Sequence, residues 1–128
     1  MRWWLFALLS WFLWLPPTLA QNEPKPIGPA EAAKKVNEQV TLRMEVKSAA
    51  LRKDVCFLNS EEDFKDAKNF TLFLDKEALA KLRKAKIEDP AAHFKGKTVQ
   101  VTGKVVLYRD RPEIKLSGPD AIKVVQKK

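Results

Sequence analysis

The sequence is poor in the residues that crosslink a small domain. It has one cysteine, one histidine and one tyrosine in 128 residues, and its four tryptophans all lie within the first 14. The single cysteine, Cys56, cannot form an intramolecular disulfide, so the folded chain must depend on its apolar core alone. Because Cys56 lies in the apolar run 55–58, we interpret it as a buried, inert thiol rather than a reactive or intermolecular one.

Catalytic groupings are also missing. The lone histidine, His93, has no serine or cysteine in the context of an activated nucleophile, and a catalytic base needs such a partner within hydrogen-bond reach. The cluster of arginine, glutamate and aspartate that one class of exported nuclease requires does not occur at a recognisable spacing. We therefore expect a protein that is not an enzyme and that has no cofactor.

Four carboxylates lie close together, at Glu61, Glu62, Asp63 and Asp66. Oxygen ligands suit calcium, but the alternating spacing and the glycine of an EF-hand loop are absent. We interpret the segment as a solvated acidic loop and expect no metal site, with a calcium loop as the alternative.

The first twenty residues have the pattern of an export signal. Met1 and Arg2 give a positive start, residues 3–15 are almost entirely apolar, and residues 18–20 end in Ala20 with small-residue spacing for cleavage. The apolar run is shorter than the roughly 20 residues of a membrane-spanning helix. We expect cleavage and a final location in the periplasm or the medium, with no transmembrane segment afterwards; an uncleaved anchor is the alternative.

Removal of the signal leaves enough chain for one domain. It takes away only Arg2 of the charged residues, so the net charge falls from +8 to +7. About 108 residues support one hydrophobic core. We divide the chain into the signal at 1–20, a proline-rich linker with the start of a short helix at 21–34, and one folded domain at 35–126.

The folded part alternates between strand and helix patterns. Apolar residues at every second position predict a strand with one wet face, and helix formers after an N-cap residue predict a helix. Strands are predicted at 39–47, 55–59, 70–74, 97–108 and 113–116, with an extended piece at 122–125; helices are predicted at 30–38 and 76–86, and a short turn follows Asp89. Gly103 interrupts the long strand, where a bulge or a sharp bend is expected.

The order of these elements indicates a fold. Three strands, a helix and a long strand hairpinned to a fifth are the order of a five-stranded Greek-key OB-fold barrel with one helix between strands three and four. An open sheet with a helix on one face is the alternative.

Residues 93–105 (HFKGKTVQVTGKV) strengthen the first interpretation. They resemble the fourth strand of OB-fold nucleic-acid-binding domains, which often read G-K-x-V-x-V-x-G. Residues 107–116 resemble the following hairpin, and 120–125 resemble the piece after it. The chain is also similar to small exported bacterial proteins with one such domain. The resemblance implies a binding face on strands two and three with the flanking loops, and nothing catalytic.

The basic character of the chain points to a ligand of opposite charge. Two loops that an OB-fold uses for ligands carry cations suited to phosphate, and two aromatic side chains are predicted to face away from the core. These candidate ligand-binding residues are Arg52, Lys53, Phe73, Tyr108, Arg109 and Arg111, with Phe57 as a further candidate. The sequence thus predicts a non-catalytic module that holds single-stranded nucleic acid or another polyanion between the two basic loops.

A second class of function stays open. The lysines of the 76–86 helix can serve solubility alone, the acidic loop would repel phosphate, and Phe73 can pack under the helix. In that case the domain is a cell-envelope stress or interaction protein that binds a protein, glycan or small ligand.

Overall fold

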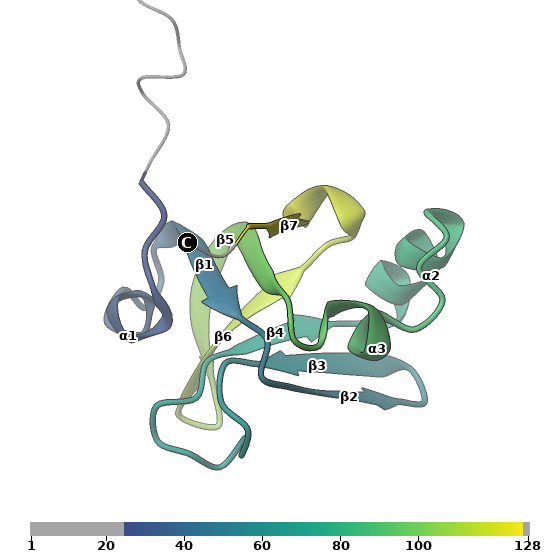
Figure 1. Cartoon of the computed structure of the whole chain (residues 1–128). Helices are drawn as coiled ribbons and strands as arrows, with labels where there is room; N and C mark the ends of the chain where they lie inside the picture. Colours follow the sequence, from purple (N-terminus) through teal and green to yellow (C-terminus); the bar gives the residue numbers. More distant parts are fainter. Residues whose placement is uncertain (1–24, 127–128) are drawn as a thin grey trace, which may run out of the picture.

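The computed structural model describes residues 25–126 (Figure 1), so the predicted export signal at 1–20 lies outside the described residues. Within 25–126 no helix is long and apolar enough to cross a membrane. The elements follow each other as α1 (Pro29–Ala32), β1 (Gln39–Glu45), β2 (Ser48–Arg52), β3 (Val55–Asn59), β4 (Thr71–Leu74), α2 (Lys76–Lys84), α3 (Pro90–Phe94), β5 (Thr98–Tyr108), β6 (Arg111–Leu116), the 3-10 turn η2 (Pro119–Ala121) and β7 (Ile122–Val125).

The strands form one mixed sheet. Its order is β1-β5-β6-β4-β3-β2, and β7 pairs with β5 off this path. Strands β4 and β6 run parallel, whereas the remaining pairs between named strands are antiparallel. The mainly β character and the succession of strands, helix, long strand and hairpin are as predicted.

The number of strands differs from the five predicted, because the described sheet has seven. The first predicted strand continues past Val46 and Lys47 as β2, which the sequence did not predict. All five residues of β2 are half-buried or exposed, so β2 lacks the alternation that reveals a one-sided strand. The predicted extended piece at 122–125 is the other addition, β7.

Two helices, rather than one, separate β4 from β5. Asp75 caps α2 by accepting a hydrogen bond from the Ala78 N–H at 2.9 Å, and Asp89 caps α3 by accepting one from the Ala92 N–H at 3.1 Å. Both N-caps are confirmed, because a side-chain oxygen satisfies an otherwise unpaired N–H of the first turn. Gly96 follows α3 with φ +84°, a conformation that glycine adopts without strain. Both helices lie on the same side of the β2–β3–β4 layer (Figure 1).

The N-terminal segment packs more closely than its proline content suggests. Ile27 forms a bridge with Leu42, and its N–H donates to the Thr41 carbonyl at 2.9 Å. Helix α1 spans only Pro29–Ala32, shorter than the predicted 30–38. Ala32 is fully buried, so this segment covers part of the core.

Strand β5 is shared by much of the sheet. Its residues 98–104 pair with β1 and its residues 105–108 with β6, and neither register contains a break at Gly103. Of the two features expected there, the bulge is absent; β5 changes its partner from β1 to β6 directly after Lys104. A Cβ at position 103 would instead lie 2.6 Å from the Cγ2 of Ile114, which is fully buried. Glycine is therefore required because the two strands approach each other too closely for a side chain.

We predict that Gly103→Ala destabilises the domain by about 1–3 kcal/mol, because the methyl group overpacks a closed core. Urea unfolding followed by circular dichroism measures the change. Gly28→Ala is the matched control, since Gly28 has φ −85° and nothing within 4 Å of an added Cβ. Equal stability of Gly103→Ala and wild type would contradict the role assigned to Gly103.

Candidate functional site

The outer face of β3 and β4 carries a pair of aromatic rings. Along both strands buried residues alternate with half-buried ones, because successive side chains of a strand point to opposite faces. Phe57 and Phe73 are directly paired across the strands, and their ring centroids are 5.4 Å apart with the planes inclined by 44°. Phe73 therefore faces away from the core, as predicted. We call the Phe57–Phe73 pair the platform.

The platform has a small side chain on one side and a cation on the other. Register places Ala50 of β2 beside Phe57 and Lys115 of β6 beside Phe73. The Lys115 Nζ lies 3.1 Å from an Asp75 carboxylate oxygen, and 61% of the Lys115 side chain is exposed. The N–H of Ala78 and the neighbouring Lys115 lower the pKa of Asp75. An aromatic surface edged by an exposed ammonium group is suited to a planar ligand that carries negative charge.

The predicted basic residues do not converge on one spot. Arg52 and Lys53 lie at the β2–β3 turn, where Arg52 pairs with Val55. Arg109 and Arg111 lie at the β5–β6 hairpin, where Tyr108 pairs with Arg111. These turns are at opposite ends of the outer face, with the platform between them (Figure 1).

Arg111 is engaged with the protein itself. Its Nη1 donates to the Phe64 carbonyl at 2.8 Å, and its Nη2 donates to the Lys65 carbonyl at 3.3 Å. These bonds tie the start of β6 to the loop between β3 and β4. The sequence predicted Arg111 as a residue that binds phosphate, but it did not predict these bonds to the loop, because no local sequence pattern reveals them.

The β3–β4 loop is organised around a buried amide. The Asn69 Nδ2 lies 3.2 Å from Asn59 Oδ1, 3.1 Å from Thr71 Oγ1 and 3.3 Å from the Phe64 carbonyl, and Asn69 Oδ1 accepts from the Glu61 N–H at 3.1 Å. Asn69 and Asn59 are buried. Since a buried polar group is costly unless it is hydrogen-bonded, these contacts give the predicted solvated loop a defined backbone.

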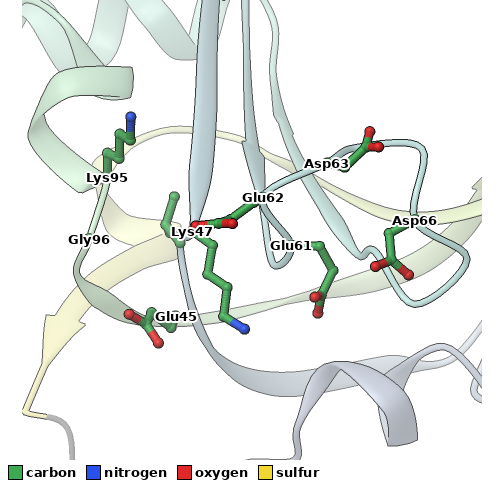
Figure 2. A pocket seen from close by; sticks show the side chains of 9 residues that line it. Glu45, Lys47, Glu61, Glu62, Asp63, Asp66, Lys95 and Gly96 are labelled. Carbon is green, nitrogen blue, oxygen red and sulfur yellow. The ribbon is translucent and has the colours of Figure 1, made fainter.

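The acidic residues of this loop line a separate cavity of about 630 Å³, between the end of β1 and the start of β5 (Figure 2). Its charged lining residues are Glu45, Lys47, Glu61, Glu62, Asp63, Asp66 and Lys95. The loop carboxylates spread along the backbone rather than converge on one point. Within residues 25–126 no group of three or more histidine, cysteine, aspartate or glutamate side chains is placed to hold a metal ion. The negative lining is unfavourable for a phosphate chain.

Cys56 and His93 have contrasting surroundings. Cys56 is fully buried, and this burial, followed by the charge of Asp89, raises the pKa of its thiol to about 12. The interpretation of Cys56 as a buried thiol is confirmed. His93 is exposed on α3 with its ring against Phe94, at a centroid distance of 4.7 Å. Desolvation and, to a smaller extent, the charge of Lys97 lower the pKa of His93.

Comparison with known proteins identifies the fold but no close relative. No protein-family model matches the chain, and no curated protein matches it in sequence. Among solved structures it is similar to a putative aspartyl-tRNA synthetase from Leishmania major Friedlin (TM-score 0.54, 14% identity over 82% of this chain) and to the asparaginyl-tRNA synthetase from Pyrococcus horikoshii (TM-score 0.54, 16% identity over 81%). The chain spans only 21% and 24% of the length of these two proteins.

A third similar structure is OBody AM1L10 bound to hen egg-white lysozyme, with a TM-score of 0.56, 19% identity, and coverage of 82% of this chain and 98% of that one. The fold is thus mainly β with a mixed sheet, similar to OB-fold domains. At these identities the likeness concerns the fold alone.

The sequence did not predict Lys115 or Phe64 as candidate site residues, and it indicated Phe57 only as a further candidate. Lys115 could have been found from the alternation of Ile114, Lys115 and Leu116, and Phe57 from the same pattern in β3. The position of Phe64 beside Arg111 depends on a contact across 47 residues, for which the sequence contains no signal.

Glu113 provides a test of the electrostatics of this face. It lies on β6 opposite Thr71, and burial raises the pKa of its carboxyl group. Folding therefore favours the protonated form, so stability falls as the pH rises from the ordinary glutamate range through the raised pKa. We predict that Glu113→Gln is more stable than wild type at pH 7 and that the difference shrinks towards pH 4. Melting temperatures at both pH values measure this, and a difference that is independent of pH would contradict it.

Proposed function

We propose that the chain is a non-catalytic binding module whose outer face holds single-stranded nucleic acid. The observation that carries this proposal is the platform, in which Phe57 and Phe73 lie half-buried and directly paired at a ring distance of 5.4 Å. Stacking of a base on an aromatic side chain contributes about 1–3 kcal/mol and does not depend on the sequence of bases.

The charges around the platform support the proposal. Lys115 borders it directly, and Arg52 and Lys53 are exposed at the nearer end of the face. Each cation that neutralises a phosphate releases condensed counterions, so affinity should fall steeply with salt. The two similar synthetases are named for tRNA, which is consistent with a nucleic-acid ligand.

The proposed face belongs to a sheet that we infer to close as a Greek-key barrel. The sheet order begins with β1 and ends with β2, which follow each other in the chain. Between them the Val46 N–H donates to the Lys97 carbonyl, and the Lys47 N–H donates to the Asn59 carbonyl, both at 2.9 Å. Closure predicts NMR contacts from Val46 to Lys97 and from Lys47 to Asn59 in the same molecule. Absence of either set would favour an open sheet.

The binding proposal is tested by fluorescence anisotropy with labelled ten-nucleotide oligothymidylate. We predict measurable affinity at low salt that declines as salt increases. Phe57→Ala and Phe73→Ala should each weaken binding by about 1–3 kcal/mol, roughly 5- to 150-fold, because each removes a stacking surface.

Val124→Ala is the matched control, because Val124 is apolar, 47% exposed and located on β7, away from the platform. Circular dichroism verifies that each variant is folded. The recovered oligonucleotide should be intact after incubation with divalent metals, since no catalysis is proposed. Binding that is absent at low salt, or insensitive to both phenylalanine substitutions, would overturn the proposal.

The alternative is a cell-envelope stress or interaction protein that binds a protein, glycan or small ligand. OBody AM1L10, of whose chain the match covers 98%, is bound to lysozyme in its solved structure. In addition, Glu113 adds a carboxylate to the outer face that disfavours phosphate. A partner recovered from envelope extract with the wild type, retained at high salt and lost with Phe73→Ala, would favour this function over the first.

We further propose that the protein is exported, on the basis of the sequence pattern in residues 1–20. Expression of the full chain in a bacterial host should give a mature form that begins at Gln21, outside the cytoplasm. Amino-terminal sequencing after cell fractionation measures this. Recovery of the uncleaved chain in the membrane fraction would instead indicate a retained anchor.

A further inference from the structure

Exposed apolar side chains gather around the β5–β6 hairpin, where Tyr108 is on the outer face and Leu107 on the opposite face of the strand. Among the described residues the large apolar side chains with high exposure are Phe64 at 60%, Leu107 at 52%, Tyr108 at 55% and Val124 at 47%. All but Val124 lie in the β5–β6 hairpin or in the loop that Arg111 holds against it. Exposure of several such groups in one place marks a surface that contacts a ligand or partner.

The rings of Phe64 and Tyr108 each have a cationic side chain over one face. The Lys65 Nζ lies 5.8 Å from the Phe64 ring centroid, and the Arg109 Cζ lies 5.3 Å from the Tyr108 ring centroid. A cation over an aromatic face is a stable arrangement, and it places positive charge beside a surface on which a base can stack. The Phe64–Lys65 and Tyr108–Arg109 pairs therefore resemble the platform with Lys115, because each provides a ring on which a base can stack and a cation that can bind a phosphate.

Arg111 brings the backbone of the Phe64–Lys65 segment to the strand position next to Tyr108. It pairs with Tyr108 across the hairpin, and its guanidinium binds the carbonyls of Phe64 and Lys65 at 2.8 and 3.3 Å. The Phe64 carbonyl is also within 3.3 Å of the Asn69 amide nitrogen. The backbone that carries Phe64 is thus held from two directions.

The two sides of the loop differ in charge. The carboxylates of Glu61, Glu62 and Asp63 line the cavity of Figure 2, and neither Phe64 nor Lys65 is part of that lining. The acidic side of the loop faces the cavity, whereas the Phe64–Lys65 segment is bound to Arg111. An acidic loop therefore contributes an aromatic ring and a cation to a face that attracts polyanions.

We propose that Phe64 and Tyr108 form a second stacking station for bases of the same single strand, with Arg111 as its positioning residue; this inference rests on the proposed function. The platform and the station are separated by four residue steps along β6, from Lys115 to Arg111, or about 13 Å at strand geometry. Successive stacked nucleotides are about 3.4 Å apart. A trinucleotide that keeps this spacing spans about 7 Å and occupies only one site, whereas a decanucleotide can reach both.

The test compares oligothymidylates of three and ten nucleotides. The double variant Phe64→Ala/Tyr108→Ala should bind the decamer at least about fivefold more weakly than wild type, while the trimer still binds at the platform with unchanged affinity for that site. NMR shift titration measures the weak trimer, and anisotropy measures the decamer. Val124→Ala should bind both oligonucleotides as wild type does.

Arg111→Lys separates positioning from charge. Lysine keeps the positive charge but lacks the planar fork that reaches two carbonyls. We expect faster amide hydrogen exchange in residues 62–66 and weaker binding of the decamer, with binding of the trimer unchanged. Full decamer affinity in Arg111→Lys would show that charge alone is needed and would overturn the positioning role.

The outcomes distinguish this inference from the function on which it rests. If wild type binds no oligonucleotide, the proposed function fails, and the station with it. If Phe73→Ala weakens binding of the decamer and the double variant does not, the station is wrong and the proposed function stands. Equal losses for trimer and decamer in the double variant would also overturn the station, since the two sites would not then be separate.

Discussion

Strand β5 can lie close to β6 only because position 103 has no side chain, and the arrangement of the other strands depends on that approach. A Cβ on Gly103 would come within 2.6 Å of Ile114. Among the described strands β5 pairs with β1, β6 and β7, and β4 joins this group through its parallel pairing with β6. The platform on β3 and β4 is thus linked to β5 through β6, whose Ile114 side chain occupies the space next to Gly103.

Features that depend on near neighbours in the chain could be predicted from the sequence. The N-caps Asp75 and Asp89 each satisfy an N–H three residues further on. Strict alternation located β1 and β5 and correctly turned Phe73 away from the core. In each case a local periodicity or one side chain decides the structure, so no knowledge of distant contacts is needed.

The remaining features depend on register or on distant partners. Strand β2 has no alternation and is defined by its pairing with β3. The platform exists because the register places Phe57 opposite Phe73, and a shift by one residue would turn one ring into the core. Arg111 looked like a free cation, yet its partners are 46 and 47 residues away. The sequence therefore predicted which residue types would line the candidate face better than how they are arranged.

Because Cys56 is buried, formation of a disulfide between two molecules depends on the opening of the domain. Two molecules can join through this sulfur only when both have exposed it, because the thiol has no solvent-accessible surface in the folded state. In an oxidising solution, the rate at which crosslinked dimers accumulate would therefore depend on the population of opened molecules as well as on their collisions. The amount of disulfide-linked dimer in an aged sample would therefore report how often the core has opened during storage.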